Sequence, residues 1–212
     1  MTKIKIFVFN PFQENTFLLY DDSNECIVID PGCNEEKEFA ELEQFISENN
    51  LTLKSIINTH CHIDHIMGNA HLVNKYNVTS IAHKEDLPLL ERSNDMALAF
   101  GFSVEEPPVP TKFVVEGDEI SFGNTILKVI HVPGHSLGSI VLYNKEDKFL
   151  IAGDVLFAGS IGRTDLPGGN HDALLSGIKE KLFTLDSDIV VYPGHGESTT
   201  IAHERNTNPY FN

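Results

Sequence analysis

Residues 59–65 read Thr-His-Cys-His-Ile-Asp-His, and this stretch indicates the fold of the whole chain. It holds four side chains that bind divalent metal ions well, namely His60, His62, Asp64 and His65. Side chains two positions apart in an extended segment share a face, so we expect His60, His62 and Asp64 to point the same way. His65 would join them where the chain turns into the helix that follows. Two ligand pairs from one short turn can serve two neighbouring ions.

Three more side chains of the same chemistry close predicted strands further along the chain. His135 and His195 each follow Pro-Gly, and Asp154 follows Ala-Gly. Glycine and proline let the backbone turn sharply, so we expect these side chains to point into one cleft. Any one of them alone is more often a turn residue. Four separate strand ends that carry metal-binding side chains together indicate a metal centre.

The hydrophobic pattern predicts strands followed by helices, twice over. Ile-, Val- and Phe-rich segments bounded by Asn, Asp and Ser predict strands, and apolar residues at helical spacing predict a helix from Glu35 to Asn49. Residues 93–110 contain three prolines and are expected to be irregular, as a loop over an active site or a connector. This order favours two packed sheets with helices outside, in one domain over 1–212. The other predicted strands cover 3–9, 16–20, 26–29, 53–58, 80–82, 112–116, 119–122, 125–132, 138–143, 148–152 and 189–192, and the other helices 68–76, 84–92, 172–183 and a short segment after Glu197.

Charge and composition restrict the classes of function. Lys and Arg number 15 against 31 Asp and Glu, for a net charge of −16, so the surface repels phosphate backbones and nucleic-acid binding is disfavoured. The sequence contains no run of about 18 apolar residues, so no membrane span is predicted. The three cysteines are odd in number, which favours a reducing, cytoplasmic setting. Cys61 is expected to be a packed thiol that points away from the metals, because it lies between two ligands. Of the other histidines, His71, His83 and His171 lack a ligand-like context, and His203 is expected to make a structural hydrogen bond.

The seven metal-binding residues resemble the metallo-β-lactamase superfamily, and within it the branch of glyoxalase II (hydroxyacylglutathione hydrolase) and its shorter relatives. The resemblance extends from Asn15 to the stretch Thr-Ile-Ala-His-Glu-Arg-Asn-Thr-Asn-Pro at 200–209. It implies an α/β (α+β) four-layer αβ/βα sandwich, in which two mixed sheets carry outer helices and the metal site lies at one edge. By position, it implies a first metal held by His60, His62 and His135, a second held by Asp64, His65 and His195, and Asp154 as the bridge.

This ligand count is that of a catalytic centre. Each ion would receive three protein ligands and a share of Asp154, which leaves an open position. We expect two divalent ions to lower the pKa of a bridging water. Zinc is the metal expected first, and the same ligands also accept iron or manganese. The resulting hydroxide would attack the carbonyl of a small (thio)ester substrate, and a thiolate would leave. Asp64 would act both as a ligand and as the group that orients the hydroxide or takes its proton.

Several relatives within the superfamily fit the residues less well. True β-lactamases typically lack a carboxylate at the position of Asp154, flavodiiron proteins carry Glu where His62 stands, and the acidic surface opposes RNA processing. The main alternative resembles persulfide dioxygenase, with one iron held by His60 or His62 together with His135 and Asp154. A second alternative is a non-catalytic metal-binding protein.

The substrate side departs from glyoxalase II. The chain stops 17 residues after His195, so we expect no C-terminal helical domain for glutathione binding. Where glyoxalase II has a Lys-Phe-Tyr segment, this chain reads Arg163-Thr164-Asp165. Arg163 is a candidate for gripping a substrate carboxylate in a bidentate manner, and an internal ion pair with Asp165 is the other interpretation. The sequence does not specify the thiol carrier or the oligomeric state.

Overall fold

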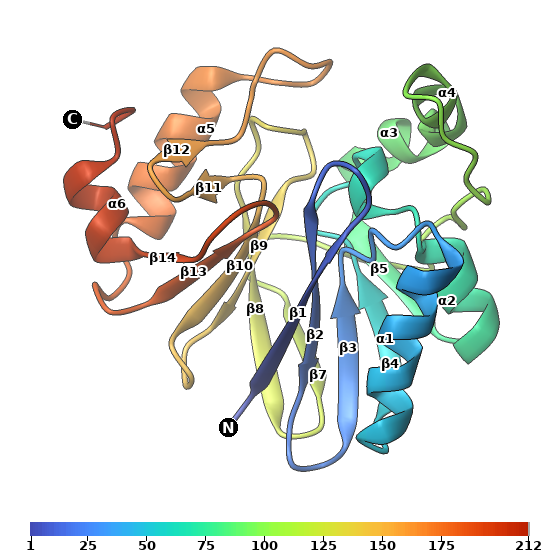
Figure 1. Cartoon of the computed structure of the whole chain (residues 1–212). Coiled ribbons are helices and arrows are strands. Elements are labelled where there is room, and N and C mark those ends of the chain that lie inside the picture. Colours follow the sequence, from blue (N-terminus) through green and yellow to red (C-terminus); the bar gives the residue numbers. More distant parts are fainter. Residues whose placement is uncertain (212) are drawn as a thin grey trace.

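Two six-stranded sheets packed face to face form the centre of the molecule (Figure 1). The computed structural model describes residues 1–211. The first sheet keeps chain order and the second runs β14-β13-β10-β9-β8-β7, with a separate two-stranded ribbon, β11–β12. The strands are β1 (Lys3–Phe9), β2 (Glu14–Tyr20), β3 (Glu25–Ile29), β4 (Thr52–Ile57), β5 (Thr79–His83), β6 (Lys112–Val114), β7 (Glu119–Phe122), β8 (Thr125–His131), β9 (Ile140–Asn144), β10 (Phe149–Gly153), β11 (Leu156–Phe157), β12 (Ser160–Ile161), β13 (Val190–Pro193) and β14 (Thr199–Thr200).

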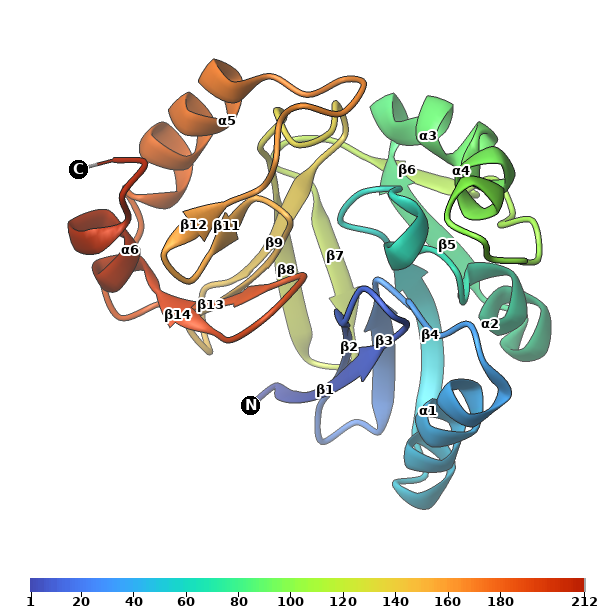
Figure 2. The same cartoon turned by 45° about the horizontal axis from the view of Figure 1, so that its top comes forward.

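Both sheets are mixed, and helices cover their outer faces (Figure 2). β1, β2 and β3 pair antiparallel, whereas β3 to β6 are parallel; in the second sheet only β10 and β13 pair parallel. The helices over the first sheet are α1 (Glu36–Glu48), α2 (Asn69–Tyr76), α3 (Leu87–Glu91) and α4 (Ser93–Ala99), and those over the second are α5 (His171–Gly177), continued by a π-helical turn (Ile178–Leu182), and α6 (Ile201–Thr207).

Alternation along buried strands explains the four layers. In β2, Phe17 and Leu19 enter the core between the two sheets, whereas Leu18 packs on the other face with residues of α1 and α2. In β3, Ile27 and Val28 divide in the same way, because successive side chains of a strand point to opposite faces. A third core lies between the second sheet and α5 and α6. The expected sandwich of two mixed sheets with outer helices is therefore confirmed, and the single-domain assignment stays a prediction.

Two local expectations about backbone structure are wrong. Residues 93–110 are not irregular throughout, since α4 occupies the first seven of them with Ala97 buried, and only the proline-containing remainder lacks regular structure. The run at 59–65 is not an extended continuation of β4, which ends at Ile57; Ile63–His65 form a 3-10 turn. Smaller differences are the unpredicted strands β11, β12 and β14 and the π-helical end of the predicted helix 172–183. Within residues 1–211 no helix has both the length and the apolar character needed to cross a bilayer.

Candidate metal centre

The metal-binding side chains follow the carboxyl ends of four strands, which meet at one edge of the sandwich. The run at 59–65 follows β4, and His135, Asp154 and His195 follow β8, β10 and β13. Gly153, just before Asp154, has a φ of +49°, and a Cβ there would collide with the side chain of Thr59. Only glycine allows the two sheets to approach this closely at the site.

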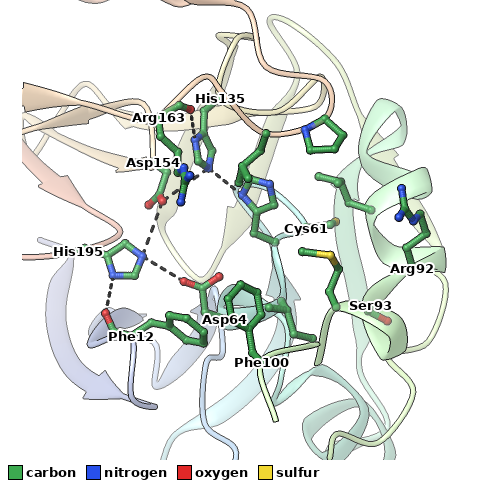
Figure 3. A pocket seen from close by; sticks show the side chains of 16 residues that line it. Phe12, Cys61, Asp64, Arg92, Ser93, Phe100, His135, Asp154, Arg163 and His195 are labelled. Carbon is green, nitrogen blue, oxygen red and sulfur yellow. Dashed lines mark hydrogen bonds and ion pairs between the residues drawn. The ribbon is translucent and has the colours of Figure 1, made fainter. Parts of the chain in front are cut away.

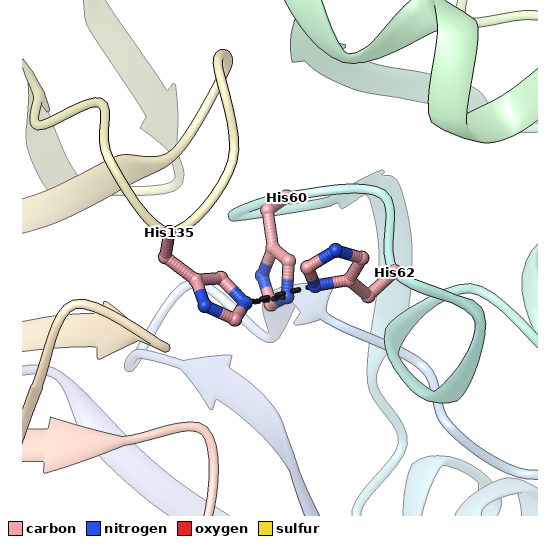
Figure 4. Close-up of side chains that lie close together, drawn as sticks. All are labelled: His60, His62 and His135. Atoms are coloured by element: carbon pink, nitrogen blue, oxygen red, sulfur yellow. Dashed lines mark hydrogen bonds between the residues drawn. The ribbon is translucent and has the colours of Figure 1, made fainter. Parts of the chain in front are cut away.

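Three imidazoles from both sheets form the first cluster (Figure 4). His135 Nε2 lies 2.8 Å from His62 Nδ1 and 3.2 Å from His60 Nε2. Nitrogen ligands that are about 2.1 Å from one ion, at angles of roughly 90–110°, lie about 3.0–3.4 Å apart. The three nitrogens therefore already have nearly the spacing of ligands that share one metal ion.

Asp64, His65 and His195 form the second cluster, and Asp154 lies between the two clusters. Asp64 Oδ2 is 3.2 Å from His195 Nε2 and 3.7 Å from His65 Nε2. Asp154 Oδ1 is 3.5 Å from His65 Nε2. Its other oxygen, Oδ2, is 3.7 Å from His195 Nε2 and 3.6 Å from Nε2 of His135, a member of the first cluster. One carboxylate thus faces both ligand sets.

Hydrogen bonds to backbone carbonyls set the tautomers of two ligands. His135 Nδ1 donates to the Arg163 carbonyl at 2.8 Å, and His195 Nδ1 donates to the Phe12 carbonyl at 3.1 Å. Because Nδ1 carries the proton in both rings, Nε2 presents its lone pair to the site. Such bonds orient the imidazole and raise its basicity as a ligand.

The carboxylate of Asp30, at the end of β3, sets the tautomers of two other ligands, His60 and His65. Its Oδ2 accepts from His65 Nδ1 at 3.2 Å and from the Thr59 hydroxyl at 2.6 Å, and that hydroxyl lies 3.1 Å from His60 Nδ1. His60 and His65 therefore also direct Nε2 into the site. Asp30 was not predicted to be part of the site; its position in Asp-Pro-Gly at a strand end is the signal that the sequence offers.

Asp86 is a second residue of the site that was not predicted. Its carboxylate accepts from the Cys61 amide at 2.9 Å, the Ser136 hydroxyl at 2.8 Å and the Gly138 amide at 2.6 Å. These groups flank His60, His62 and His135 in the chain, so this buried carboxylate ties together the two loops that carry the first cluster. No sequence motif marks it, because its partners lie 25 to 52 positions away.

The residues present fit two divalent cations. Among residues 1–211, His65 Nε2 and Asp154 Oδ1 are buried without any hydrogen-bond partner. Leaving a buried polar atom unpaired costs about 1–3 kcal/mol, so such atoms in a native protein need a ligand to explain them. Imidazole nitrogens and carboxylate oxygens are the ligand types that zinc, iron and manganese accept.

The protonation of the ligands is consistent with metal binding. Burial, reinforced by the neighbouring imidazoles His135 and His65, lowers the pKa of His62 to about 3, which keeps the ring neutral at physiological pH. Burial also lowers the pKa of His65, but the carboxylates of Asp64 and Asp154 outweigh it and raise that pKa well above the ordinary value. A cation at this position replaces the proton that the carboxylates would otherwise attract.

A cavity of about 290 Å³ opens onto both clusters (Figure 3). Ligands of both clusters, including Asp64 and Asp154, lie on one side of it, and the α3–α4 segment forms the opposite wall. Cys61 also lines the cavity; its side chain is 3% exposed, and burial raises the pKa of the thiol well above its ordinary value. The thiol is thus packed, as expected, whereas its orientation away from the metals stays a prediction. The apolar lining residues are Phe12, Ile63, Leu89, Met96, Phe100, Leu166 and Pro167.

Arg163 lines the cavity but already has an internal partner. Its Nε and Nη2 donate to the two carboxylate oxygens of Asp165 at 2.7 and 2.8 Å. The internal ion pair proposed as the second interpretation is therefore present. Substrate binding by Arg163 stays a prediction, and it would require exchange of this partner for the substrate.

The remaining histidines lie outside the centre. His71 lies 2.7 Å from a carboxylate oxygen of Glu43. His83 stacks on His131 at 4.1 Å with the rings 15° from parallel, near Glu85. Nitrogen lone pairs lie in the plane of their ring, so two parallel stacked rings do not direct them at one ion. The group His83, Glu85 and His131 is therefore not a metal site in this geometry.

Two relatives are similar in sequence over nearly the full chain. The chain is 36% identical over 211 residues to the hydroxyacylglutathione hydrolase GloC of Haemophilus influenzae, covering 99% of this chain and 98% of the relative. It is 36% identical over 203 residues to the probable metallo-hydrolase YqgX of Bacillus subtilis, covering 95% and 94%.

Solved structures agree with the fold. The B3 metallo-beta-lactamase BLEG-1 matches with a TM-score of 0.90 and 31% identity, over 99% of both chains. TTHA1623 in a di-iron-bound form matches with a TM-score of 0.87 and 36% identity, over 97% of this chain and 99% of that one. ETHE1 from Myxococcus xanthus matches with a TM-score of 0.79 and 27% identity, over 98% and 83%.

The family model for the Metallo-beta-lactamase superfamily matches residues 9–195, a span that contains all seven candidate metal ligands. Members of this superfamily bind divalent metals and are mostly hydrolases. The family match, the fold and the ligand geometry agree, and the chain belongs to the metallo-β-lactamase superfamily.

Proposed function

We propose that this protein is a glyoxalase II-like thioesterase that works with two divalent metal ions, with zinc as the first candidate. The observation that carries the proposal is the position of Asp154, whose two oxygens lie 3.5–3.7 Å from ligand atoms of both clusters. The hydroxyacylglutathione hydrolase name of the Haemophilus relative supports the thioester class.

Each residue of the proposed site has a separate role. His60, His62 and His135 would hold one ion, and Asp64, His65 and His195 the other, with Asp154 shared. When bound, two such ions lower the pKa of water and polarise the substrate carbonyl.

The chain itself supplies orientation and proton transfer. Asp64 lines the cavity and is positioned by His195, so its carboxylate orients the attacking water and accepts its proton. Apolar side chains on the α3–α4 wall, such as Met96 and Phe100, seat the organic part of the substrate and exclude bulk water. The expelled thiolate leaves through the open cavity.

Two alternative activities, β-lactam hydrolysis and persulfide dioxygenation, can be tested together with the thioesterase proposal. β-Lactam hydrolysis is favoured by the similarity to BLEG-1 and opposed by Asp154, a carboxylate that true β-lactamases typically lack at this position. Persulfide dioxygenation would use one iron held by His135, Asp154 and one of His60 or His62. Both differ from the proposal in metal stoichiometry or in product.

The deciding experiment combines metal analysis with a substrate panel on protein purified without chelators and without air. The proposal expects close to two metals per chain, zinc-rich, and hydrolysis of hydroxyacyl-glutathione thioesters with one free thiol released per turnover. If the protein contains one iron per chain and consumes oxygen when persulfide is added, the thioesterase proposal is wrong and the dioxygenase replaces it. Faster hydrolysis of β-lactams than thioesters would replace it by a lactamase, and metal loading without any turnover would indicate a non-catalytic protein.

A further inference from the structure

The cavity holds two arginines on opposite walls, and they differ in what they bind. Arg163 is neutralised by the bidentate pair with Asp165 described above. Arg92 lines the cavity too, yet within residues 1–211 its guanidinium has neither a hydrogen bond nor an ion pair. Arg92 is exposed at the cavity wall in a chain with 31 acidic and 15 basic side chains, and its guanidinium is available to an anion from outside the chain.

The backbone holds Arg92 at a fixed place. It lies between α3 and α4, where its amide donates to the Leu89 carbonyl at 3.2 Å and its carbonyl accepts from the Met96 amide at 3.0 Å. Leu89 and Met96 also line the cavity, so these hydrogen bonds hold the backbone of Arg92 on its apolar wall. Figure 3 shows Arg92 across the cavity from Asp154 and His195.

The geometry points to Arg92 as the residue that binds a carboxylate of the substrate, and thus to a thioester with an anionic thiol carrier. This assignment rests on the proposed thioesterase function. The planar guanidinium matches a carboxylate with two parallel hydrogen bonds. The carboxylates that line the cavity, Asp64 and Asp154, lie among the histidines as candidate metal ligands and face the reacting end of the substrate. A carboxylate at the far end of the substrate therefore has one favourable place, next to Arg92.

Two thioesters with the same hydroxyacyl group test the assignment. One carries glutathione, which has carboxylates, and the other carries N-acetylcysteamine, which has none. We expect Arg92→Ala to raise KM about fivefold for the glutathione thioester and less than twofold for the neutral one. Added salt should reduce the difference between wild type and variant, because it screens an exposed ion pair. Arg92→Lys should recover part of the loss.

Control variants separate Arg92 from general charge effects. Arg163→Ala compares the second arginine, and Lys128→Ala removes an exposed cation of β8 that does not line the cavity. The same change of KM on both thioesters in Arg92→Ala would overturn the assignment, as would a larger glutathione-specific loss in Arg163→Ala.

Calorimetric binding of S-methylglutathione keeps the test independent of turnover. Its thiol is blocked, so it reports the carboxylate contact without thiolate binding to metal. We expect about fivefold weaker binding to Arg92→Ala than to wild type. If no thioester is hydrolysed but this difference is found, the thioesterase proposal fails while the carboxylate site stands. Equal affinities for both proteins would overturn the carboxylate site.

Discussion

Single carboxylates around the site hold the ligand loops in place, and Asp86 is one of them. It accepts three hydrogen bonds of 2.6–2.9 Å from the loops of the first cluster. In Asp86→Asn, an amide NH2 would face one of these donors, and the loops would lose a contact. We expect the first metal to be bound 10- to 100-fold more weakly, the usual effect of removing a group that supports metal ligands. Chelator competition measures it.

The neighbouring exposed carboxylate provides the control for that substitution. Glu85→Gln changes the same charge one position away, and Glu85 has a side chain that is 54% exposed. Equal metal retention in Asp86→Asn and Glu85→Gln would contradict the positioning role of Asp86.

Asp64 combines two roles that one substitution can distinguish. In Asp64→Asn the side chain keeps an oxygen ligand but loses the ability to accept a proton. We expect kcat for the thioester to fall at least hundredfold, within the range for loss of a general base, with the melting temperature preserved. Metal analysis of the same sample tells whether the loss is of the base or of the second ion. Unchanged kcat would contradict both roles; Asp172→Asn, an exposed carboxylate of α5, is the matched control.

At the scale of elements, Asp21 ties two turns from opposite sheets together at the edge away from the metal centre. It accepts from the Ser23 amide of its own β2–β3 turn at 2.9 Å, and from the Asn124 amide and Thr125 hydroxyl of the β7–β8 turn at 2.7 and 2.9 Å. Burial raises the pKa of this carboxyl, but the hydrogen bonds outweigh it and lower the pKa to about 2.

This lowered pKa predicts a pH-dependent contribution to stability. Because the folded state holds the ionised form, the contribution is complete above pH 4, near the unfolded pKa, and disappears as the pH falls towards 2. A shift of this size corresponds to about 2 kcal/mol. Asp21→Asn should therefore lower the free energy of unfolding by about 2 kcal/mol at pH 7 and by clearly less at pH 3, in urea titrations. Asp22→Asn, whose side chain is 75% exposed, should have little effect at either pH. A pH-independent loss in Asp21→Asn would contradict the explanation.

At the scale of the whole molecule, the metals are expected to join the two halves of the sandwich. His60 and His62 follow β4 of the first sheet and His135 follows β8 of the second, so each half brings ligands to one ion. Without cations, the carboxylates of Asp64 and Asp154 also lie close to each other, around His65 and His195. Bound metal therefore stabilises the native state by linkage, since the unfolded chain has no assembled site.

Chelation measures this effect directly. A free metal concentration of 1,000 times Kd stabilises by about 4 kcal/mol, which corresponds to roughly 8–16 °C in the melting temperature of a chain of this size. We expect a chelator to lower the melting temperature by this order, and added zinc to restore it. Asp154→Ala should show a smaller shift. The same melting temperature with and without chelator would contradict a metal link between the sheets.

Local patterns determined much of the architecture. β1 and β7 have the predicted bounds, and most other strands and α1 and α2 lie within two residues of theirs, because period-two and helical spacing are properties of neighbouring residues. The failures have equally local reasons. Ser93 to Ala99 contain no helix breaker and form α4, whereas proline-based reasoning extended the irregular segment too far. At His60 to Asp64 the alternation rule assumed an extended chain that ends at Ile57.

The sequence by itself determined the superfamily, the order of strands and helices, and the types of ligand that the centre offers, because these depend on residue identity and on short spacings. Only the tertiary structure decided which ligand atoms converge, since His60 and His135 lie 75 positions apart and meet through sheet packing. It also placed Asp86 and Asp30 where they hydrogen-bond the ligands and their loops. It paired Arg163 with Asp165 and left Arg92 at the cavity without a partner in the part of the chain that the structure describes. Apart from the Arg163–Asp165 pair, these contacts join residues distant in sequence, and their geometry is fixed only when the two sheets pack against each other.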